Sequence, residues 1–199
     1  GRARAYDIES GTDAEMLAAV DAAAEVLRGL GAKVVDVVLP SRPRFDASTQ
    51  AILLAEGFAI HHEWLRTRPQ DYGRVTRERL MMGAFVTGAE YVQAQRLRRI
   101  ITAEVDAVLA GCDAILCAGI TATAPRVADV DEGPFRRSHP ITAAFNGTGH
   151  PALALPGGFG ATGLPLGLQL VGRSFAEATL FRIGHAYEQA TGWMERRPA

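Results

Sequence analysis

The feature that most constrains the fold is a helical pattern that runs directly into a β-branched stretch. Apolar side chains recur at helical spacing in the first pattern, at Met16, Leu17, Val20, Ala24 and Leu27. Thr12 and Glu15 stand at the two positions of a capping box, and Gly29 supplies the end of the helix. Residues 33–39 then read as a largely buried strand. A helix that feeds a buried strand is typical of α/β proteins.

Helices and strands continue to alternate along the chain. Helices are predicted over residues 47–67, 77–82, 88–110 and 174–191, with Gly192 ending the last one. Short apolar strands are predicted over residues 113–117, 152–155 and 166–171, and the last two form a hairpin across a Gly-rich connection. Asn146 and Gly147 read as a turn. Neither an internal repeat nor a linker divides the sequence, so residues 1–199 are predicted to form a single domain.

Composition narrows the class of protein. With 48% hydrophobic and 22% charged residues, the chain is globular rather than disordered. A formal net charge of −1 gives no general attraction to nucleic acid, so no nucleic-acid partner is expected. No apolar run is long enough to cross a bilayer, and no stretch reads as a signal peptide, so no membrane partner and a cytoplasmic location are expected. Cys112 and Cys117 are interpreted as buried small hydrophobes rather than as a disulfide.

Motifs for metals, nucleotides and a nucleophile elbow all fail in context. Adjacent His61 and His62 on a helix point about 100° apart, so they do not share a metal ion, and no metal site is predicted. Residues 158–163 match G-x-G-x-x-G, but strand alternation follows where a dinucleotide site needs a helix. Ser174 lies between a predicted strand and a predicted helix, as the serine of a nucleophile elbow does. With Glu177, however, Ser174 is better explained as a second capping box.

The C-terminal third carries more specific motifs. They read Phe145-Asn-Gly-Thr-Gly-His-Pro-Ala-Leu-Ala-Leu-Pro-Gly-Gly-Phe159 and Gly163-Leu-Pro-Leu-Gly-Leu-Gln-Leu-Val-Gly172. Upstream lies Thr121-Ala-Thr-Ala-Pro125, and the middle helices contribute Glu56, His61, Tyr72, Gly73, Arg79, Gly83 and Tyr91. Together these residues resemble the C-terminal portion of the amidase signature hydrolases over almost the whole chain. The resemblance implies a three-layer α/β/α fold around a mixed sheet, and hydrolysis of a carboxamide C–N bond.

The catalytic unit that the resemblance implies is absent from this sequence. In the family a Ser nucleophile, a second Ser joined through a cis peptide and a neutral Lys act together, and both serines lie in a Gly/Ser-rich run. This chain has one lysine, Lys33, and five scattered serines, which are Ser10, Ser41, Ser48, Ser138 and Ser174. We therefore expect residues 1–199 to be the C-terminal segment of a longer amidase fold, with no catalytic residue of its own and no activity alone.

The resemblance also indicates which residues approach the substrate. C-terminal segments of such enzymes shape the substrate cleft, and the long irregular stretch over residues 118–140 is of the kind that is usually functional. By resemblance, Thr123, His139 and Thr142 bind the substrate, a small amide. The alternative stays open that Thr123 and Thr142 only satisfy backbone groups of the loop. No cofactor is implied.

Two hypotheses follow for the partners of this chain. In the first, a missing N-terminal segment, or a second chain that supplies it, docks on an exposed apolar face, and a homodimer through that face is a further expectation. In the second, the chain is a non-catalytic binding or structural module that keeps the fold without the chemistry. The second hypothesis predicts a self-contained sheet whose edges are covered or charged.

Overall fold

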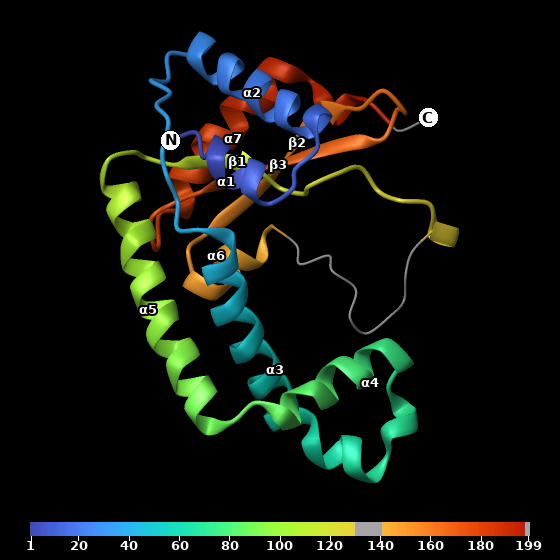
Figure 1. Cartoon of the computed structure of the whole chain (residues 1–199). Helices are drawn as coiled ribbons and strands as arrows, with labels where there is room; N and C mark the ends of the chain where they lie inside the picture. The colour runs from blue at the N-terminus through green and yellow to red at the C-terminus, as the bar shows by residue number, and fades with distance from the viewer. Residues whose placement is uncertain (130–140, 198–199) are drawn as a thin grey trace.

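The centre of the fold is a three-stranded antiparallel sheet (Figure 1). The computed structural model describes residues 1–129 and 141–197. Its strands are β1 (Ile115–Ala118), β2 (Ala152–Phe159) and β3 (Pro165–Val171), in the order β1-β3-β2. β2 and β3 form the predicted hairpin, with Leu155 opposite Leu168. The predicted strand after the glycines of residues 158–163 is confirmed, and it lies where a dinucleotide site needs a helix.

The N-terminus extends this sheet with parallel pairing. Arg2 forms parallel bridges to Leu116 of β1 and to Asp36. The Leu116 N–H donates to the Gly1 carbonyl over 2.7 Å, and the Arg2 N–H donates to the Val35 carbonyl over 2.7 Å. The sheet is therefore mixed and the class is α/β, as the resemblance implies. The buried strand predicted over residues 33–39 is wrong, because this segment is an edge with one bridged residue and mostly exposed side chains.

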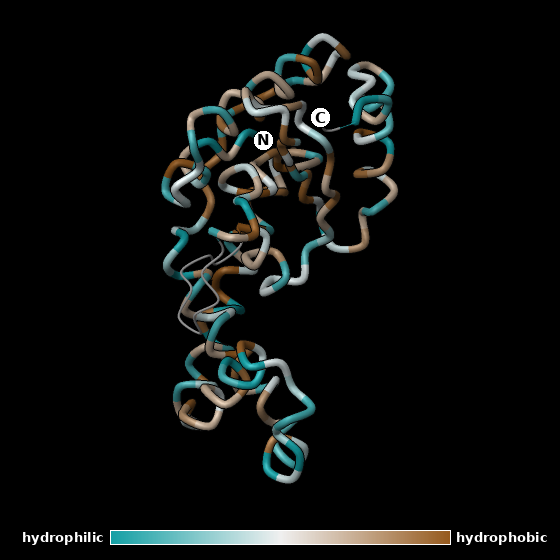
Figure 2. The backbone as a smooth tube through the Cα atoms, turned by 90° about the vertical axis from the view of Figure 1, so that its right-hand side faces the viewer, coloured by the Kyte–Doolittle hydropathy of each residue, from teal (hydrophilic) through white to brown (hydrophobic). Residues whose placement is uncertain are grey.

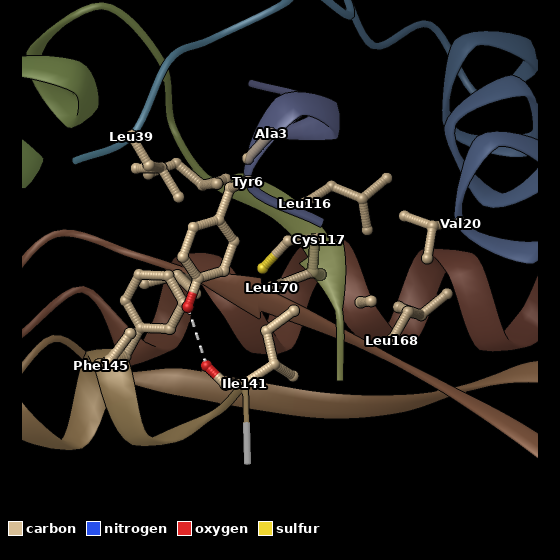
Figure 3. Packing of buried hydrophobic residues seen from close by; sticks show 14 of the residues in the cluster. Ala3, Tyr6, Val20, Leu39, Leu116, Cys117, Ile141, Phe145, Leu168 and Leu170 are labelled. Atoms are coloured by element: carbon tan, nitrogen blue, oxygen red, sulfur yellow. Dashed lines mark hydrogen bonds between the residues drawn. The ribbon is translucent and has the colours of Figure 1, made fainter. Parts of the chain in front are cut away.

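Helices α2 (Ala14–Gly29) and α7 (Glu177–Thr191) contact each other and the sheet. Gly184 makes the approach of α7 to β2 close, since a Cβ there would lie 2.5 Å from Leu153 Cδ2. On the other side, α1 (Arg4–Glu9) and α6 (Ala143–Thr148) bring Tyr6 and Phe145 toward each other, with ring centroids 6.3 Å apart (Figure 3). The Tyr6 hydroxyl donates to the Ile141 carbonyl over 3.0 Å, so this contact is both apolar and hydrogen-bonded.

Three helices form an arm that extends away from the sheet, and Figures 1 and 2 show it from two sides. They are α3 (Arg42–Thr67), α4 (Arg74–Met81) and α5 (Gly88–Ala110), with 3₁₀ turns at Pro69–Asp71 and Met82–Phe85. The bounds of α5 match the prediction, whereas α3 begins five residues before the predicted start at residue 47. An ion pair between Arg44 and Glu104 joins α3 to α5 with two hydrogen bonds of 2.7 and 2.9 Å. Short 3₁₀ turns also occur at Val127–Asp129 and Trp193–Glu195.

Both predicted capping boxes are wrong. Asp13 caps α2, because its Oδ1 accepts from the Met16 N–H over 2.7 Å, and the buried Thr12 hydroxyl has no partner among the described residues. Glu15 instead accepts from the Ala161 N–H in the hairpin loop. Helix α7 has no side-chain cap and begins at Glu177.

The predicted Asn146–Gly147 turn is wrong, since both residues lie inside α6. This helix is capped at its C-terminal end by Gly149, which is in the left-handed conformation (φ 78°). That ending is typical of glycine, which has no Cβ to oppose a positive φ.

Within residues 1–129 and 141–197, no helix combines the length and the apolar character that a bilayer crossing requires.

Candidate functional site

Buried polar side chains converge on the carboxyl end of β1. Asp7 on α1 is fully buried, and its Oδ1 accepts from the Ala118 N–H over 3.0 Å while its Oδ2 accepts from Arg2 Nη1 over 2.5 Å. Gln169 on β3 is also buried and donates from Nε2 to the Ala118 carbonyl over 3.1 Å. Side chains therefore bond both the N–H and the C=O of Ala118, the last residue of β1. In a longer sheet, a neighbouring strand would bond these two groups.

The backbone beyond β1 is fixed by hydrogen bonds to other backbone groups. The Gly119 N–H donates to the Gly167 carbonyl over 2.9 Å, and the Thr121 carbonyl accepts from the Asp13 N–H over 2.9 Å. A Cβ on Gly119 would lie 3.1 Å from the Leu168 backbone, so a larger residue would push this segment away from the sheet. The loop that carries Thr123 therefore leaves the sheet from a defined position.

The electrostatics of this cluster are those of a buried site. Burial raises the pKa of the Asp7 carboxyl, while the hydrogen bonds from Ala118 N–H and from Arg2 act in the opposite direction. Arg2 also contacts the partly exposed Asp21, with Nε 2.9 Å from Oδ1. Burial raises the pKa of the Cys117 thiol far above its usual range, so this cysteine is a neutral packing residue and not a nucleophile.

The structure places the predicted substrate residues on two separate segments. Thr123 lies half-buried in the loop after β1, and Thr142 is the half-buried residue that precedes α6. Within the part of the chain that the structure describes, neither threonine hydroxyl makes a hydrogen bond to another residue, and no described contact joins the two. His139 falls outside the described residues. Their role in substrate binding stays a prediction.

Several residues that carry the family resemblance in the middle helices make structural contacts in the arm. Tyr91 on α5 donates to Glu56 Oε1 on α3 over 2.8 Å, and His61 Nδ1 lies 2.9 Å from the Tyr72 hydroxyl. The ring of His61 also meets the ring of Tyr72 edge-on. Gly83 allows the turn Met82–Phe85 to touch α3, because a Cβ there would overlap the Leu54 carbonyl oxygen. These residues hold α3, α4 and α5 together.

The lysine and the described serines lie on different elements. Lys33 is exposed and lines a surface hollow of about 480 Å³ with Gly1, Cys112 and Arg182, and none of the described serines lines that hollow. Ser48 is buried in α3, where its hydroxyl donates to the Phe45 carbonyl over 3.1 Å. Over residues 1–129 and 141–197, no group of three or more His, Cys, Asp and Glu side chains could hold a metal ion.

Sequence reasoning missed the polar cluster at the end of β1. Asp7 gave no signal, because nothing in the sequence indicates that it meets a residue 111 positions away. Gln169 gave a weak signal, since it is the one polar side chain within the apolar run Leu166–Val171 of β3. A buried glutamine in a strand needs hydrogen-bond partners, and this requirement could have singled it out.

The fold is that of an α/β protein, and comparison with known proteins identifies the family. The amidase family profile matches residues 4–181. Over residues that amount to 93% of this chain, a glutamyl-tRNA(Gln) amidotransferase subunit from Aromatoleum aromaticum is 36% identical. The corresponding protein of Dechloromonas aromatica is 34% identical over 94% of the chain. The chain belongs to the amidase signature family.

Solved structures support the same assignment. A structure described as "Crystal structure of amidase" matches 100% of this chain with a TM-score of 0.79 and 27% identity, and the match covers 45% of that protein. A second, described as "An unexpected vestigial protein complex reveals the evolutionary origins of an s-triazine catabolic enzyme", matches 96% of this chain with a TM-score of 0.79 and 28% identity. The chain spans 43% and 44% of the two curated relatives, less than half of their length.

Proposed function

We propose that this chain is the C-terminal part of an amidase-type hydrolase that cleaves carboxamide C–N bonds. The observation that carries the proposal is the coverage: the family profile matches almost the whole chain, yet the chain spans only 43% of the first relative. The catalytic serines and lysine of the family then belong to the other part of the fold. This part shapes the substrate cleft and is inactive alone.

The residue inventory supports the absence of a catalytic unit. No Gly-Gly-Ser-Ser-Gly-type run exists in the sequence. Lys33 is exposed on an edge segment, whereas a lysine that acts as a neutral base needs a buried or electropositive setting that lowers its pKa. Ser48, the fully buried serine of α3, already donates to a backbone carbonyl of its own helix.

In this proposal, the loop after β1 and the start of α6 are the segments of this chain that line the substrate cleft. Asp7 and Gln169 hold the end of β1, so the loop leads Thr123 outward from a fixed anchor. Thr142 follows Ile141, whose carbonyl is held by Tyr6. In our proposal Thr123, Thr142 and His139 contact a small amide substrate.

The partner in this proposal is the N-terminal portion of the amidase fold, from the same or a second chain, and the location is the cytoplasm. Exposed apolar side chains on the arm support an association, since Ile60 and Phe85 are 71% and 84% exposed. The names of the curated relatives make transfer of an amide nitrogen on a tRNA-linked substrate the specific alternative within the class. The alternative from a different class is a non-catalytic binding or structural module.

Co-expression with the N-terminal portion of a matching amidase tests the proposal. We expect hydrolysis of simple carboxamides, measured as ammonia release, by the co-expressed pair and none by this chain alone. Hydrolysis by this chain alone would refute the proposed division of roles. A stable pair without activity on any amide would favour the non-catalytic module.

Site variants in the active pair then test the cleft. Thr123→Val and Thr142→Val are expected to lower kcat/KM at least about tenfold, the effect of losing one hydrogen bond to substrate. Thr102→Val is the matched control, because the Thr102 hydroxyl bonds to the Arg98 carbonyl within α5, away from the loop. Unchanged kcat/KM in both loop variants would show that these hydroxyls serve only the loop.

A further inference from the structure

We propose that His150 is a positioning residue that fixes helix α6, and with it Thr142, relative to helix α5. The inference rests on the proposed function, in which Thr142 contacts the substrate. His150 follows the end of α6 by two residues and precedes β2, and its imidazole ring is fully buried. The two ring nitrogens bond to Asp106 on α5 and to Thr148, the last residue of α6.

Helix α6 depends on its neighbours for its position. It has six residues, and an isolated helix of that length is not stable in water. Its contacts are with α3 and α5 (Figure 1). The approach to α3 is close, since a Cβ on Gly147 would lie 2.3 Å from Thr49 Oγ1. Toward α5, the hydrogen bond from His150 to Asp106 joins the end of α6 to the middle of the longer helix.

The hydrogen bonds of the imidazole indicate which nitrogen carries a hydrogen. An ionised carboxylate only accepts, so the 3.1 Å contact between His150 Nε2 and Asp106 Oδ1 requires a hydrogen on Nε2. Nδ1 lies 2.9 Å from the Thr148 hydroxyl, which can donate to a bare nitrogen or accept from an N–H. The same hydroxyl lies 3.4 Å from the Phe145 carbonyl, which is its acceptor in the second case. Both ring contacts are therefore satisfied whether His150 is neutral or charged.

The two partners differ in exposure, and this difference makes Asp106 the part that can be changed. The His150 side chain is fully buried, whereas 57% of the Asp106 side chain is exposed. Without Asp106 the buried Nε2 would lose its acceptor, and a buried donor without a partner is unfavourable. A ring that turned toward water would pull on the end of α6, because only Gly149 separates His150 from Thr148.

Thr142 stands at the other end of the same helix. Ile141, the residue before it, has its carbonyl bound by the Tyr6 hydroxyl over 3.0 Å (Figure 3). Tyr6 on α1 thus anchors the start of α6, and His150 anchors its end to α5. The Thr142 side chain makes no capping hydrogen bond to α6, so in our proposal its hydroxyl is left for the substrate.

Nitrogen NMR of the imidazole tests the hydrogen-bonding part of the proposal in this chain alone. We expect Nε2 of His150 to carry a hydrogen in the wild type, and its chemical shift to move in Asp106→Ala. Glu104→Ala is the matched control, because Glu104 is also a carboxylate of α5 but bonds to Arg44 on α3. A bare Nε2 in the wild type, or an unchanged shift in Asp106→Ala, would overturn the proposal.

Kinetics of the co-expressed pair test the positioning role. Asp106→Ala is expected to raise KM about three- to tenfold and to leave kcat within about twofold, because the contact of Thr142 with the substrate weakens. Asp106→Asn keeps an oxygen that accepts from Nε2, so it is expected to restore the wild-type KM. In a Thr142→Val background, Asp106→Ala is expected to have no further effect, since two residues that act through one contact are not additive.

The outcomes separate this proposal from the proposed function. An active pair in which Asp106→Ala has the same KM as Glu104→Ala would overturn the positioning role and leave the proposed function intact. Full additivity of Asp106→Ala and Thr142→Val would overturn it as well, because His150 would then not act through Thr142. An inactive wild-type pair would instead refute the proposed function, and with it the positioning role.

Discussion

Gly83→Ala is predicted to destabilise the arm strongly. Gly83 is buried in the turn Met82–Phe85, where an added Cβ would lie 2.0 Å from the Leu54 carbonyl oxygen and 2.6 Å from Phe58 Cβ. Both contacts are far inside van der Waals separation, and one of them is to backbone, which cannot rotate away. Overpacking of this kind costs about 1–3 kcal/mol, and the backbone obstacle places this variant at the upper end, about 3 kcal/mol.

Thermal unfolding followed by circular dichroism measures this cost. For a domain of this size 1 kcal/mol corresponds to about 2–4 °C, so Gly83→Ala is expected to lower Tm by about 6–12 °C. Gly88→Ala is the control, because nothing lies within 4 Å of a Cβ there and its φ is not positive. That variant is expected to be neutral or more stable by up to about 1 kcal/mol. Equal Tm values for the two variants would refute the packing argument.

Three further predictions concern hydrogen bonds and charge. Tyr6→Phe leaves the buried Ile141 carbonyl without its partner and is expected to cost about 1–3 kcal/mol in urea unfolding. The hydrogen bond from Arg44 lowers the pKa of the Glu104 carboxyl. The stability that this ion pair contributes to the fold is therefore present above the ordinary glutamate pKa and is lost as pH falls through the lowered value. Unfolding of wild type and Glu104→Gln, compared from pH 7 to pH 3, should therefore converge at the acidic end. Asp13→Ala removes the cap of α2 and should cost about 0.5–2 kcal/mol, again by urea unfolding.

Sequence periodicity predicted long elements well and edge elements badly. Helix α5 has the predicted bounds because apolar side chains recur along it at helical spacing and the helix packs against α3. The hairpin of β2 and β3 was also predicted, since two apolar runs flank a Gly-rich connection. The β-branched run over residues 33–39 failed, because composition reports a preference for extended backbone and not the number of neighbours that a strand finds. Val38 is 78% exposed there.

Local capping chemistry was ambiguous for a similar reason. Thr12 and Asp13 are both good N-cap residues, and the sequence alone does not choose between them. The structure selects Asp13, whose own N–H is bound to the Thr121 carbonyl in the loop beyond β1. A tertiary contact therefore fixes where α2 begins. Such a contact between positions 13 and 121 has no trace in a local motif.

In the candidate site, too, some residues were predicted from the sequence and others became known only from the fold. The residues that resemble the family motif, Thr123 and Thr142, were available from the sequence, whereas the groups that hold their segments came only from the fold. Asp7 and Gln169 reach Ala118 from two different elements, and Asp13 reaches Thr121 from a third. Burying a carboxylate is costly unless it is paired, and Asp7 is paired with Arg2 where it also accepts from the Ala118 N–H at the end of β1. The position of the loop after β1 is consequently a property of the assembled sheet, and it depends on side chains that lie far from the loop in sequence.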